Sequence, residues 1–281
     1  MEMYTTSQWV MFFYIYCFLG WVWESAYVSV IKHRFVNRGF LKGPFLPLYG
    51  SGAICILVVT IPVRGNIPLM FLIGMVSATV LEYVTGVVME RLFRVRYWDY
   101  TGKFMNIKGH ICLSSTLCWG VMTILVVDGL HKYIENLVFS VDERYITLAV
   151  LILTPILTAD FVTSFHAAIH LRDTLVRNEK IKEELGKLVE KKRELELRLA
   201  EAGEKAKEQA MEQMPQEMQE LLLKIGELRG RLKIPSIRSG KSVRGLLRRN
   251  PSAISPWHKE TFAELKTNLI EKFEEIRKQD E

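Results

Sequence analysis

The sequence predicts an all-α, polytopic membrane protein with about five transmembrane helices and a cytosolic helical tail. Two observations carry this prediction. The mean hydropathy is +0.12 although 24% of the 281 residues are charged. Residues 1–170 contain 12 Lys and Arg and 10 Asp and Glu, whereas residues 171–281 contain 25 and 21. An apolar half is therefore joined to a charged half, which excludes a single soluble enzyme domain, a disordered chain and a disulfide-rich module.

The apolar half divides into stretches that are long enough, or nearly so, to cross a bilayer as helices, which takes about 20 residues each. They cover about residues 9–31, 43–63, 65–90, 111–128 and 145–171. The predicted organisation is a transmembrane domain over 1–171, coiled-coil-like helices over 172–234, and a basic segment with a terminal amphipathic helix over 235–281.

The cations give these helices one consistent orientation. Lys and Arg cluster after the first, third and fifth stretches, over residues 32–42, 91–108 and from 172 onward, and are sparse in the other connections. Cytoplasmic loops carry the excess of Lys and Arg in membrane proteins. We therefore expect a multi-pass protein of the cell membrane, with its N-terminus outside and its C-terminus in the cytoplasm.

The charged half predicts helices that associate through an apolar seam. Apolar or small residues recur at alternating steps of four and three, at Ile181, Leu185, Leu188, Leu195, Leu199, Ala202 and Ala206, and later at Met218, Leu221, Ile225, Leu228 and Leu232. This is the heptad spacing of a coiled coil. A helical hairpin, a stalk that forms a homo-oligomer through the coiled coil, and a single solvated helix all stay open.

Residues 229–259 contain nine Lys and Arg and no acidic residue. Anionic lipid attracts such a segment by about 1 kcal/mol per basic residue near the surface. We expect membrane lipids as its partner, and not nucleic acid; a flexible basic linker is the alternative. A terminal amphipathic helix is predicted to begin at Ser255 and Pro256. Its apolar face comprises Phe262, Leu265, Leu269, Phe273 and Ile276.

Three acidic residues lie inside the apolar stretches: Glu24, Glu82 and Asp160. An ionised carboxylate in hydrocarbon is costly, so such residues face a protein interior or water and usually serve a function. We interpret all three as candidate intramembrane functional residues. For each glutamate the alternative is a structural hydrogen bond or an interfacial ion pair, and Asp160 is expected to pair within the helix bundle.

The surroundings of the two glutamates match each other. A phenylalanine follows each after eleven residues, Phe-Val-Asn at 35–37 resembles Phe-Met-Asn at 104–106, and Tyr-Gly at 49–50 corresponds to Trp-Gly at 119–120. The pattern predicts a degenerate parallel repeat of two helices. Repeats in membrane proteins place the functional site at their interface, which would make Glu24 and Glu82 a pseudo-symmetric pair.

Two connections are rich in residues suited to sharp turns or binding. The loop at 37–50 contains three glycines and two prolines, and its Arg38, beside free backbone N–H groups, is suited to an anionic headgroup. The loop at 97–109 is an aromatic interfacial anchor with one acid. A pair of plain interfacial turns is the alternative. The candidate residues of this anion, headgroup or loop site are Asn37, Arg38, Gly39, Gly43, Pro44, Trp98, Asp99, Asn106 and Gly109.

The sequence predicts no catalytic residue, metal site or cofactor. His166, His170 and Asp173 share one helical face, but a single helix supplies too few ligands for a metal site. Residues 240–242 resemble the end of a Walker A loop, yet Pro235 stands where that motif requires glycine. Any ATPase would therefore be a separate subunit.

Several motifs resemble those of one bacterial family. They are the segments at 18–24, 37–50, 81–85, 96–100 and 106–112. Together they are similar to the family called putative ABC-transporter type IV permeases, over about residues 9–130, with a looser likeness in the tail. The resemblance implies a permease-like membrane component without an assigned substrate.

Three functions stay open at this stage. The first is a permease-like component of an ABC transporter that lacks its own ATPase domain. The second is a membrane enzyme on a lipid or isoprenoid substrate, with Glu24 and Glu82 as acid and base and Arg38 on the headgroup. The third is a non-catalytic scaffold or sensor that signals through the coiled-coil tail. The enzyme is less expected, because the sequence has no nucleophile elbow, metal motif or acid-rich diphosphate motif.

Overall fold

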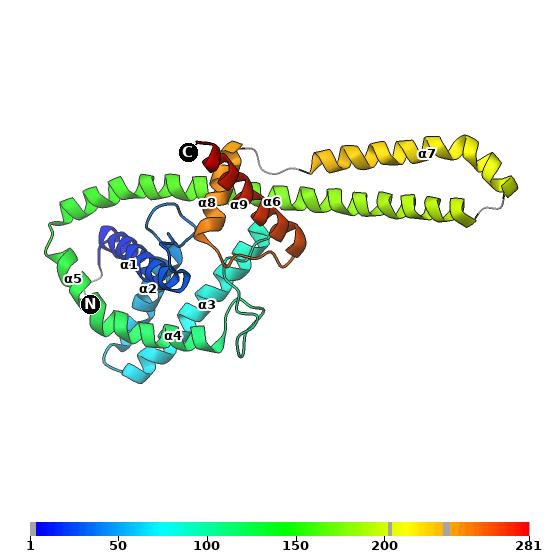
Figure 1. Cartoon of the computed structure of the whole chain (residues 1–281). Helices are drawn as coiled ribbons and strands as arrows, with labels where there is room; N and C mark the ends of the chain where they lie inside the picture. Colours follow the sequence, from blue (N-terminus) through cyan, green and yellow to red (C-terminus); the bar gives the residue numbers. More distant parts are fainter. Residues whose placement is uncertain (1–3, 202–203, 233–236, 281) are drawn as a thin grey trace. The chain divides into compact units, whose positions relative to one another are not determined.

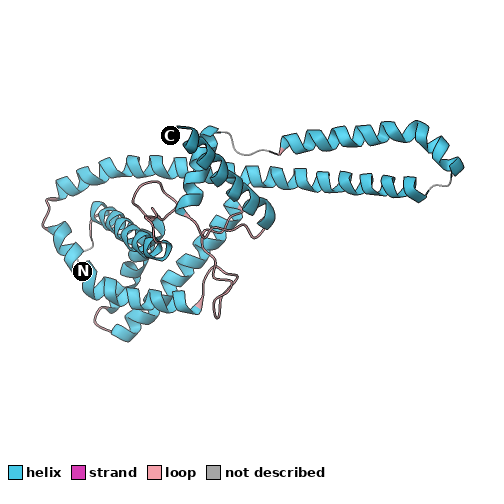
Figure 2. Ribbon diagram, viewed as in Figure 1, coloured by secondary structure: helices cyan, strands magenta, loops and turns pink. Residues whose placement is uncertain are grey.

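The computed structural model describes residues 4–201, 204–232 and 237–280. Over these residues the chain is helical, and its only strand-like pairings are two isolated bridges (Figure 2). The all-α prediction is thereby confirmed. The chain forms two compact units. Unit 1 comprises Met1–Ile169 and Lys241–Trp257, and unit 2 comprises His170–Gly240 and His258–Glu281.

Unit 1 contains the apolar helices (Figure 1). They are α1 (Thr6–Lys32), α2 (Pro47–Thr60) with a 3-10 turn at Ile61–Val63, α3 (Ile67–Phe93), α4 (Leu113–Ile124), a π-helical turn at Leu125–Leu130, α5 (His131–Phe139) and the first part of α6 (Glu143–Glu201). Capping residues next to these helices determine where α1 and α3 begin and end. Thr5 and Gln8 form a capping box before α1, Asn66 caps α3, and α1 and α3 end at residues in the left-handed conformation, His33 and Arg94.

Three of the helices in the described part of the chain are long and apolar enough to cross a membrane: Ile67–Phe93, Leu113–Phe139 and Glu143–Arg198. α1 matches the first predicted stretch, but its many Tyr and Trp residues lower its mean hydropathy. The apolar helix Pro47–Val63 would be only about 25 Å long, below the thickness of the hydrocarbon core. Outward side chains such as Leu72, Val76 and Leu151 are half exposed or more, which suits contact with lipid.

Two of the predicted apolar stretches belong to helices that continue beyond the predicted ends. The fourth continues past residue 128 through the π-helical turn to Phe139. The prediction stopped early because Asp128 and His131 interrupt the apolar run, yet the His131 ring is fully buried and its Nδ1 lies 2.9 Å from the hydroxyl of Tyr16. The fifth continues without a break from Glu143 to Glu201, so the predicted boundary at 171 lies inside one helix.

Glycines allow the helices of unit 1 to approach closely. A Cβ at Gly74 on α3 would lie 2.2 Å from Oγ1 of Thr123 on α4. We expect Gly74→Ala to cost about 1–3 kcal/mol, because the neighbour must move within a packed core. Thermal unfolding in detergent measures this cost. Gly129→Ala is the matched control, since its Cβ would meet nothing within 4 Å, and equal effects of the two changes would contradict the close approach.

Unit 2 contains the rest of α6, α7 (Glu204–Arg231) and α9 (Lys259–Asp280). In Figure 1, α7 runs in the direction opposite to the distal part of α6. Four seam residues are buried, namely Ile181, Leu195, Leu221 and Ile225. The apolar face of α9 is also buried at Phe262, Leu265 and Leu269, while the side chains of Phe273 and Ile276 lie outside the described residues.

Contacts between α9 and α6 hold the terminal helix within unit 2. Nζ of Lys182 lies 2.7 Å from a carboxylate oxygen of Glu264, and the hydroxyl of Thr261 donates to Glu179. α9 begins at Lys259, so the predicted start at Ser255 and Pro256 is wrong. The hydroxyl of Ser255, four residues before the helix, donates to the carbonyl oxygen of Arg94 at 2.7 Å.

The basic segment is divided between the two units. α8 (Ile237–Arg249) ends in unit 1, and Lys241–Trp257 belongs to this unit, with Val243, Leu246, Leu247, Asn250 and Ala253 buried. Leu246 is fully buried in a cluster with Phe93, Tyr97 and Ala168. In this part of the segment Leu246 and Leu247 are covered by protein, so it is not a flexible linker, and contact of its basic side chains with lipid stays a prediction. We call Lys241–Trp257 the docking segment.

Candidate functional site

One cavity in unit 1 contains both glutamates of the apolar helices α1 and α3. Its volume is about 350 Å³, and α1, α2, α3, α4, α6, the two loops and the docking segment all contribute to its lining. Among the described residues, the charged side chains on the lining are Glu24, Glu82 and Arg38. The two glutamates that the sequence singles out therefore share one chamber.

Glu24 is held in an ion pair. Its Oε1 lies 3.3 Å from Nε of Arg38, and its Oε2 accepts a hydrogen bond of 3.0 Å from the hydroxyl of Tyr49. Arg38 is itself fixed by its backbone, because its N–H donates to the hydroxyl of the buried Ser25. The charge of Glu24 is thus matched by a cation within the same wall of the cavity.

Glu82 has a different environment. Its Oε1 accepts from the hydroxyl of Tyr100 at 3.3 Å, and its Oε2 accepts from Nε1 of Trp119 at 3.0 Å. The residue is only 5% exposed. Among the residues that the structure describes, no Lys, Arg or His lies within 4.0 Å of this carboxylate. Glu82 is therefore buried among neutral hydrogen-bond donors.

Aromatic side chains make up much of the remaining lining. They come from the loops and from α2, α3, α4 and α6, and they are Phe40, Tyr49, Phe93, Tyr97, Trp98, Tyr100, Trp119, Phe161 and Phe165. The rings contact one another: the centroids of Tyr49 and Trp119 are 6.0 Å apart, and those of Phe93 and Phe165 are 5.2 Å apart. The chamber is therefore apolar apart from its three charged groups and a few hydrogen-bonding atoms.

The docking segment closes one side of the cavity. Nη1 of Arg38 donates to Oδ1 of Asn250 at 3.1 Å and to the carbonyl oxygen of Arg249 at 3.4 Å. Nη2 of Arg38 donates to the hydroxyl of Ser252 at 3.3 Å and to the carbonyl oxygen of Tyr97 at 3.5 Å. Arg38 thus joins Glu24 to a segment more than 200 positions away in the sequence.

Further bonds fix the docking segment to both loops. Nδ2 of Asn250 donates to the carbonyl oxygen of Gly39 at 3.0 Å, and Arg249 donates to that of Phe40 at 3.2 Å. Arg96 and Ile254 exchange two backbone hydrogen bonds of 2.8 and 3.0 Å. Burial lowers the pKa of Arg249, which is consistent with a guanidinium inside the protein.

Asp160 does not line the cavity with the glutamates. Its carboxylate accepts from the backbone N–H groups of Lys42, at 3.0 Å, and Gly43, at 2.7 Å, and from the hydroxyl of Ser164. It therefore pairs within unit 1, where it anchors the 37–50 loop to α6. A Cβ at Gly43 would lie 3.2 Å from the Asp160 carboxylate, which explains glycine at this position.

The other loop residues divide into two groups. Arg38, Gly39 and Trp98 line the cavity, whereas Asn37, Gly43, Pro44, Asp99, Asn106 and Gly109 do not. Asn37 accepts from Nε1 of Trp21 at 2.7 Å and donates to the carbonyl oxygen of Lys42 at 2.8 Å. Asn106 likewise donates to two carbonyl groups of its own loop. Both asparagines hold their loops in shape.

An ion-pair network stiffens the second loop. Arg96 contacts Glu90 at 2.9 Å and Asp99 at 2.8 Å, and Nε2 of His110 lies 3.1 Å from Glu90. Burial alone would raise the pKa of Asp99, but hydrogen bonds from Thr101 and Arg96 outweigh it and lower the pKa. Burial lowers the pKa of His110. The network fixes the chain that brings Trp98 and Tyr100 to the cavity.

Sequence reasoning missed four side chains of the site: Tyr49, Tyr100, Trp119 and Asn250. The repeat pairs Tyr49 with Trp119, but nothing in the pattern identifies them as hydrogen-bond donors to the glutamates. The Tyr100 hydroxyl lies beside Glu82, and its pKa is raised by burial and then by that carboxylate. No sequence pattern indicates a role for Asn250, because its contacts with Arg38 and Gly39 form only when the docking segment packs against a part of the chain more than 200 positions away.

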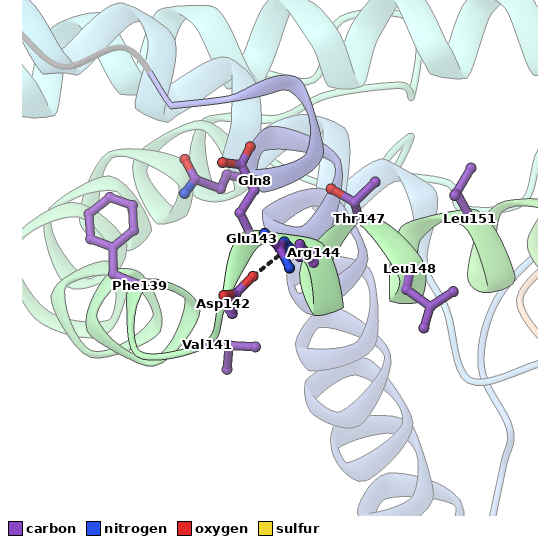
Figure 3. A pocket seen from close by; sticks show the side chains of 9 residues that line it. All are labelled: Gln8, Phe139, Val141, Asp142, Glu143, Arg144, Thr147, Leu148 and Leu151. Atoms are coloured by element: carbon purple, nitrogen blue, oxygen red, sulfur yellow. Dashed lines mark hydrogen bonds between the residues drawn. The ribbon is translucent and has the colours of Figure 1, made fainter.

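A second cavity lies at the opposite end of α1 (Figure 3). It is wide and open, with a volume of about 860 Å³, and its lining includes Gln8, Phe139 and the start of α6. The dashed line in Figure 3 joins Oδ1 of Asp142 to the backbone N–H of Arg144, at 2.9 Å. Its acidic side chains are exposed, so this cavity has no buried charge comparable to Glu82.

Comparison with known proteins places this site in a family. The family model described as "Putative ABC-transporter type IV" matches residues 11–165, which is more than half of the chain. The chain belongs to this family. A search of curated proteins and a search of solved structures each find no match.

The match to the ABC-transporter type IV family covers nearly the whole apolar part of unit 1. It includes both glutamates, Arg38 and the donors Tyr49, Tyr100 and Trp119. The docking segment, with Asn250 and Ser252, lies outside the matched residues. The family pattern thus extends over the glutamate cavity but not over the segment that closes it.

Proposed function

We propose that the chain is a multi-pass, permease-like subunit of an ABC transporter, with the glutamate cavity as part of its substrate path. The observation that carries this proposal is the single chamber that holds Glu24 and Glu82. Carboxylates within apolar helices usually mark substrate or ion pathways. Membership of the ABC-transporter type IV family supports transport over the other functions.

The geometry supports a two-helix repeat around this chamber. Glu24 on α1 receives a hydrogen bond from Tyr49 on α2, and Glu82 on α3 receives one from Trp119 on α4.

The glycine that follows each of these two donors in the sequence also makes an equivalent contact in each repeat. A Cβ at Gly50 would lie 2.9 Å from the ring of Phe13, and a Cβ at Gly120 would lie 2.5 Å from the ring of Phe71. Phe13 and Phe71 each lie eleven residues before the glutamate of their repeat.

The proposed topology has five spans, with the N-terminus outside and the C-terminus in the cytoplasm of the cell. The positions of the Lys and Arg clusters support it. Glu24 lies near the end of α1, and Glu82 lies in the second half of α3. In this topology the glutamate cavity opens nearer to the cytoplasmic side, where an ATPase subunit would act.

The tail is proposed to supply contacts outside the membrane. Because the sequence has no Walker A loop, ATP hydrolysis would come from a separate subunit. The seam residues Ile181, Leu195, Leu221 and Ile225 are buried within one chain, which supports a helical hairpin, while the heptad spacing in the sequence also allows association between two copies. The remaining basic residues of the tail would contact membrane lipids.

One observation supports the scaffold or sensor as a second candidate. The docking segment belongs to the C-terminal half of the sequence but bonds directly to Arg38 at the cavity. A ligand that moved Arg38 would therefore act on the tail. The lipid or isoprenoid enzyme, with the two glutamates as acid and base, has no comparable support.

Affinity purification of the full chain from its native cell in mild detergent tests the proposal. We expect an ATPase subunit to co-purify in stoichiometric amount, as identified by mass spectrometry. A matched purification of the chain cut after residue 177 shows whether the tail is needed for this association. If the full chain purifies alone or only with copies of itself, the transporter proposal is wrong, and the scaffold or enzyme functions take its place.

A further inference from the structure

We propose that the glutamate cavity binds an organic cation, such as a small quaternary ammonium on an apolar body, with Glu82 as the counter-ion. This inference rests on the proposed function in that it assigns a ligand class to the same cavity. Three features of the cavity support it: the charges on its lining, the hydrogen bonds that already occupy Arg38, and its aromatic walls.

Of the two carboxylates on the cavity lining, Glu82 has no cationic partner among the described residues and can therefore pair with a cationic ligand. Glu24 is matched by Arg38 at 3.3 Å, whereas Tyr100 and Trp119 give Glu82 only neutral hydrogen bonds. A buried carboxylate without a cation is costly, because its desolvation is not offset by an opposite charge, so the group holds a proton until a cation takes its place. A cationic ligand within the chamber would supply that charge, whereas an anionic ligand would add to the repulsion.

Arg38 has no N–H group left for an anion. A guanidinium carries five N–H donors, and five acceptors lie within hydrogen-bonding distance of this one. They are the Glu24 carboxylate, the carbonyl oxygens of Tyr97 and Arg249, Oδ1 of Asn250 and the hydroxyl of Ser252. An anionic headgroup at Arg38 would have to displace one of these, so the occupied guanidinium favours a cation in the chamber.

The walls suit the body of an organic cation. Nine aromatic side chains line the cavity, among them Trp98 and Trp119. Quaternary ammonium ligands are recognised by aromatic rings with a nearby negative charge, and cation–π attraction is strongest when water is excluded. The volume of about 350 Å³ lies within the usual range for small-molecule sites. A hydrated inorganic cation would gain little from such walls.

The test measures ligand binding to the purified full chain in mild detergent. The probe is benzyltrimethylammonium, and neopentylbenzene is its neutral isostere, with carbon in place of nitrogen. Quenching or shift of the tryptophan fluorescence reports occupancy, since Trp98 and Trp119 line the cavity. We expect saturable binding of the cation at least about tenfold tighter than that of the isostere, which is the size of effect expected from one charge–aromatic site.

Two variants locate the bound cation. Glu82→Gln keeps the shape of the side chain and is expected to weaken cation binding by about tenfold or more, without changing binding of the neutral isostere. Asp128→Asn is the control, because it removes a carboxylate that does not line the cavity. Thr85→Phe adds a ring to the cavity lining and leaves both glutamates in place, so it should block the cation even if Glu82→Gln fails to fold.

Each outcome of the binding test supports or overturns the assignment of an organic cation to the cavity. If the neutral isostere binds as tightly as the cation, or if benzenesulfonate binds more tightly, the cation assignment is overturned while the cavity remains a ligand chamber. If a folded protein binds no probe, the cation assignment is overturned as well. The transporter proposal is judged separately by its co-purifying ATPase, so failure of one can be distinguished from failure of the other.

Discussion

Arg38→Met is expected to lower the stability of the detergent-solubilised protein by about 1–3 kcal/mol, because it breaks a partly buried ion pair and several hydrogen bonds to a charged group. The change leaves the Glu24 carboxylate without its cation. It also removes the donors to Asn250 and Ser252, which join the docking segment to the cavity. Thermal unfolding measures the loss. Arg34→Met is the matched control, because Arg34 lies in the same connection but is exposed.

A double variant separates the two roles of Arg38. Glu24→Gln combined with Arg38→Met removes both charges, so the pair should be more stable than Arg38→Met alone. If the double variant is no more stable than the single variant, the unpaired Glu24 charge costs nothing. The stabilising effect of Arg38 would then come from its bonds to the docking segment. If Arg38→Met is as stable as Arg34→Met, neither role holds.

Much of unit 1 could be predicted because its helices follow from local patterns. The apolar runs predicted α1 and α3 to within a few residues, whereas α2 begins at Pro47, four residues after the predicted start of its stretch. The two glutamates attracted attention because a charge inside an apolar run is rare. Their match in sequence context also led to the expectation that they lie together, and both line the same cavity.

Other features of the site depend on contacts that no local pattern encodes. Asp160 looks like Glu24 in the sequence, yet its partners are backbone N–H groups of a loop more than 100 positions away. His131 ends an apolar run, but a tyrosine hydroxyl accommodates its ring in the core. Leu246 and Leu247 lie among cations, and that pattern is the same whether lipid or protein covers the leucines. Only the tertiary contacts decide between these cases.

Leu246→Glu is expected to release the docking segment from unit 1. Leu246 is fully buried against Phe93, Tyr97 and Ala168, and a carboxylate there would have no partner in an apolar cluster. We expect a cost of about 3 kcal/mol, which corresponds to an approximately hundredfold larger population of the open segment. Limited trypsin digestion measures this population, because cleavage after Arg248 or Arg249 requires the segment to leave its site.

Two further variants make this expectation specific. Leu223→Glu introduces the same charge on α7 at a side chain that is 74% exposed, so its effect on cleavage at Arg248 and Arg249 should be small. Leu246→Met keeps an apolar side chain of similar volume and should cost less than about 1.5 kcal/mol. Equal cleavage rates for Leu246→Glu and Leu223→Glu would mean that this leucine does not hold the segment. A fast rate for Leu246→Glu alone would mean that the cavity is closed by apolar packing as well as by the bonds of Arg38.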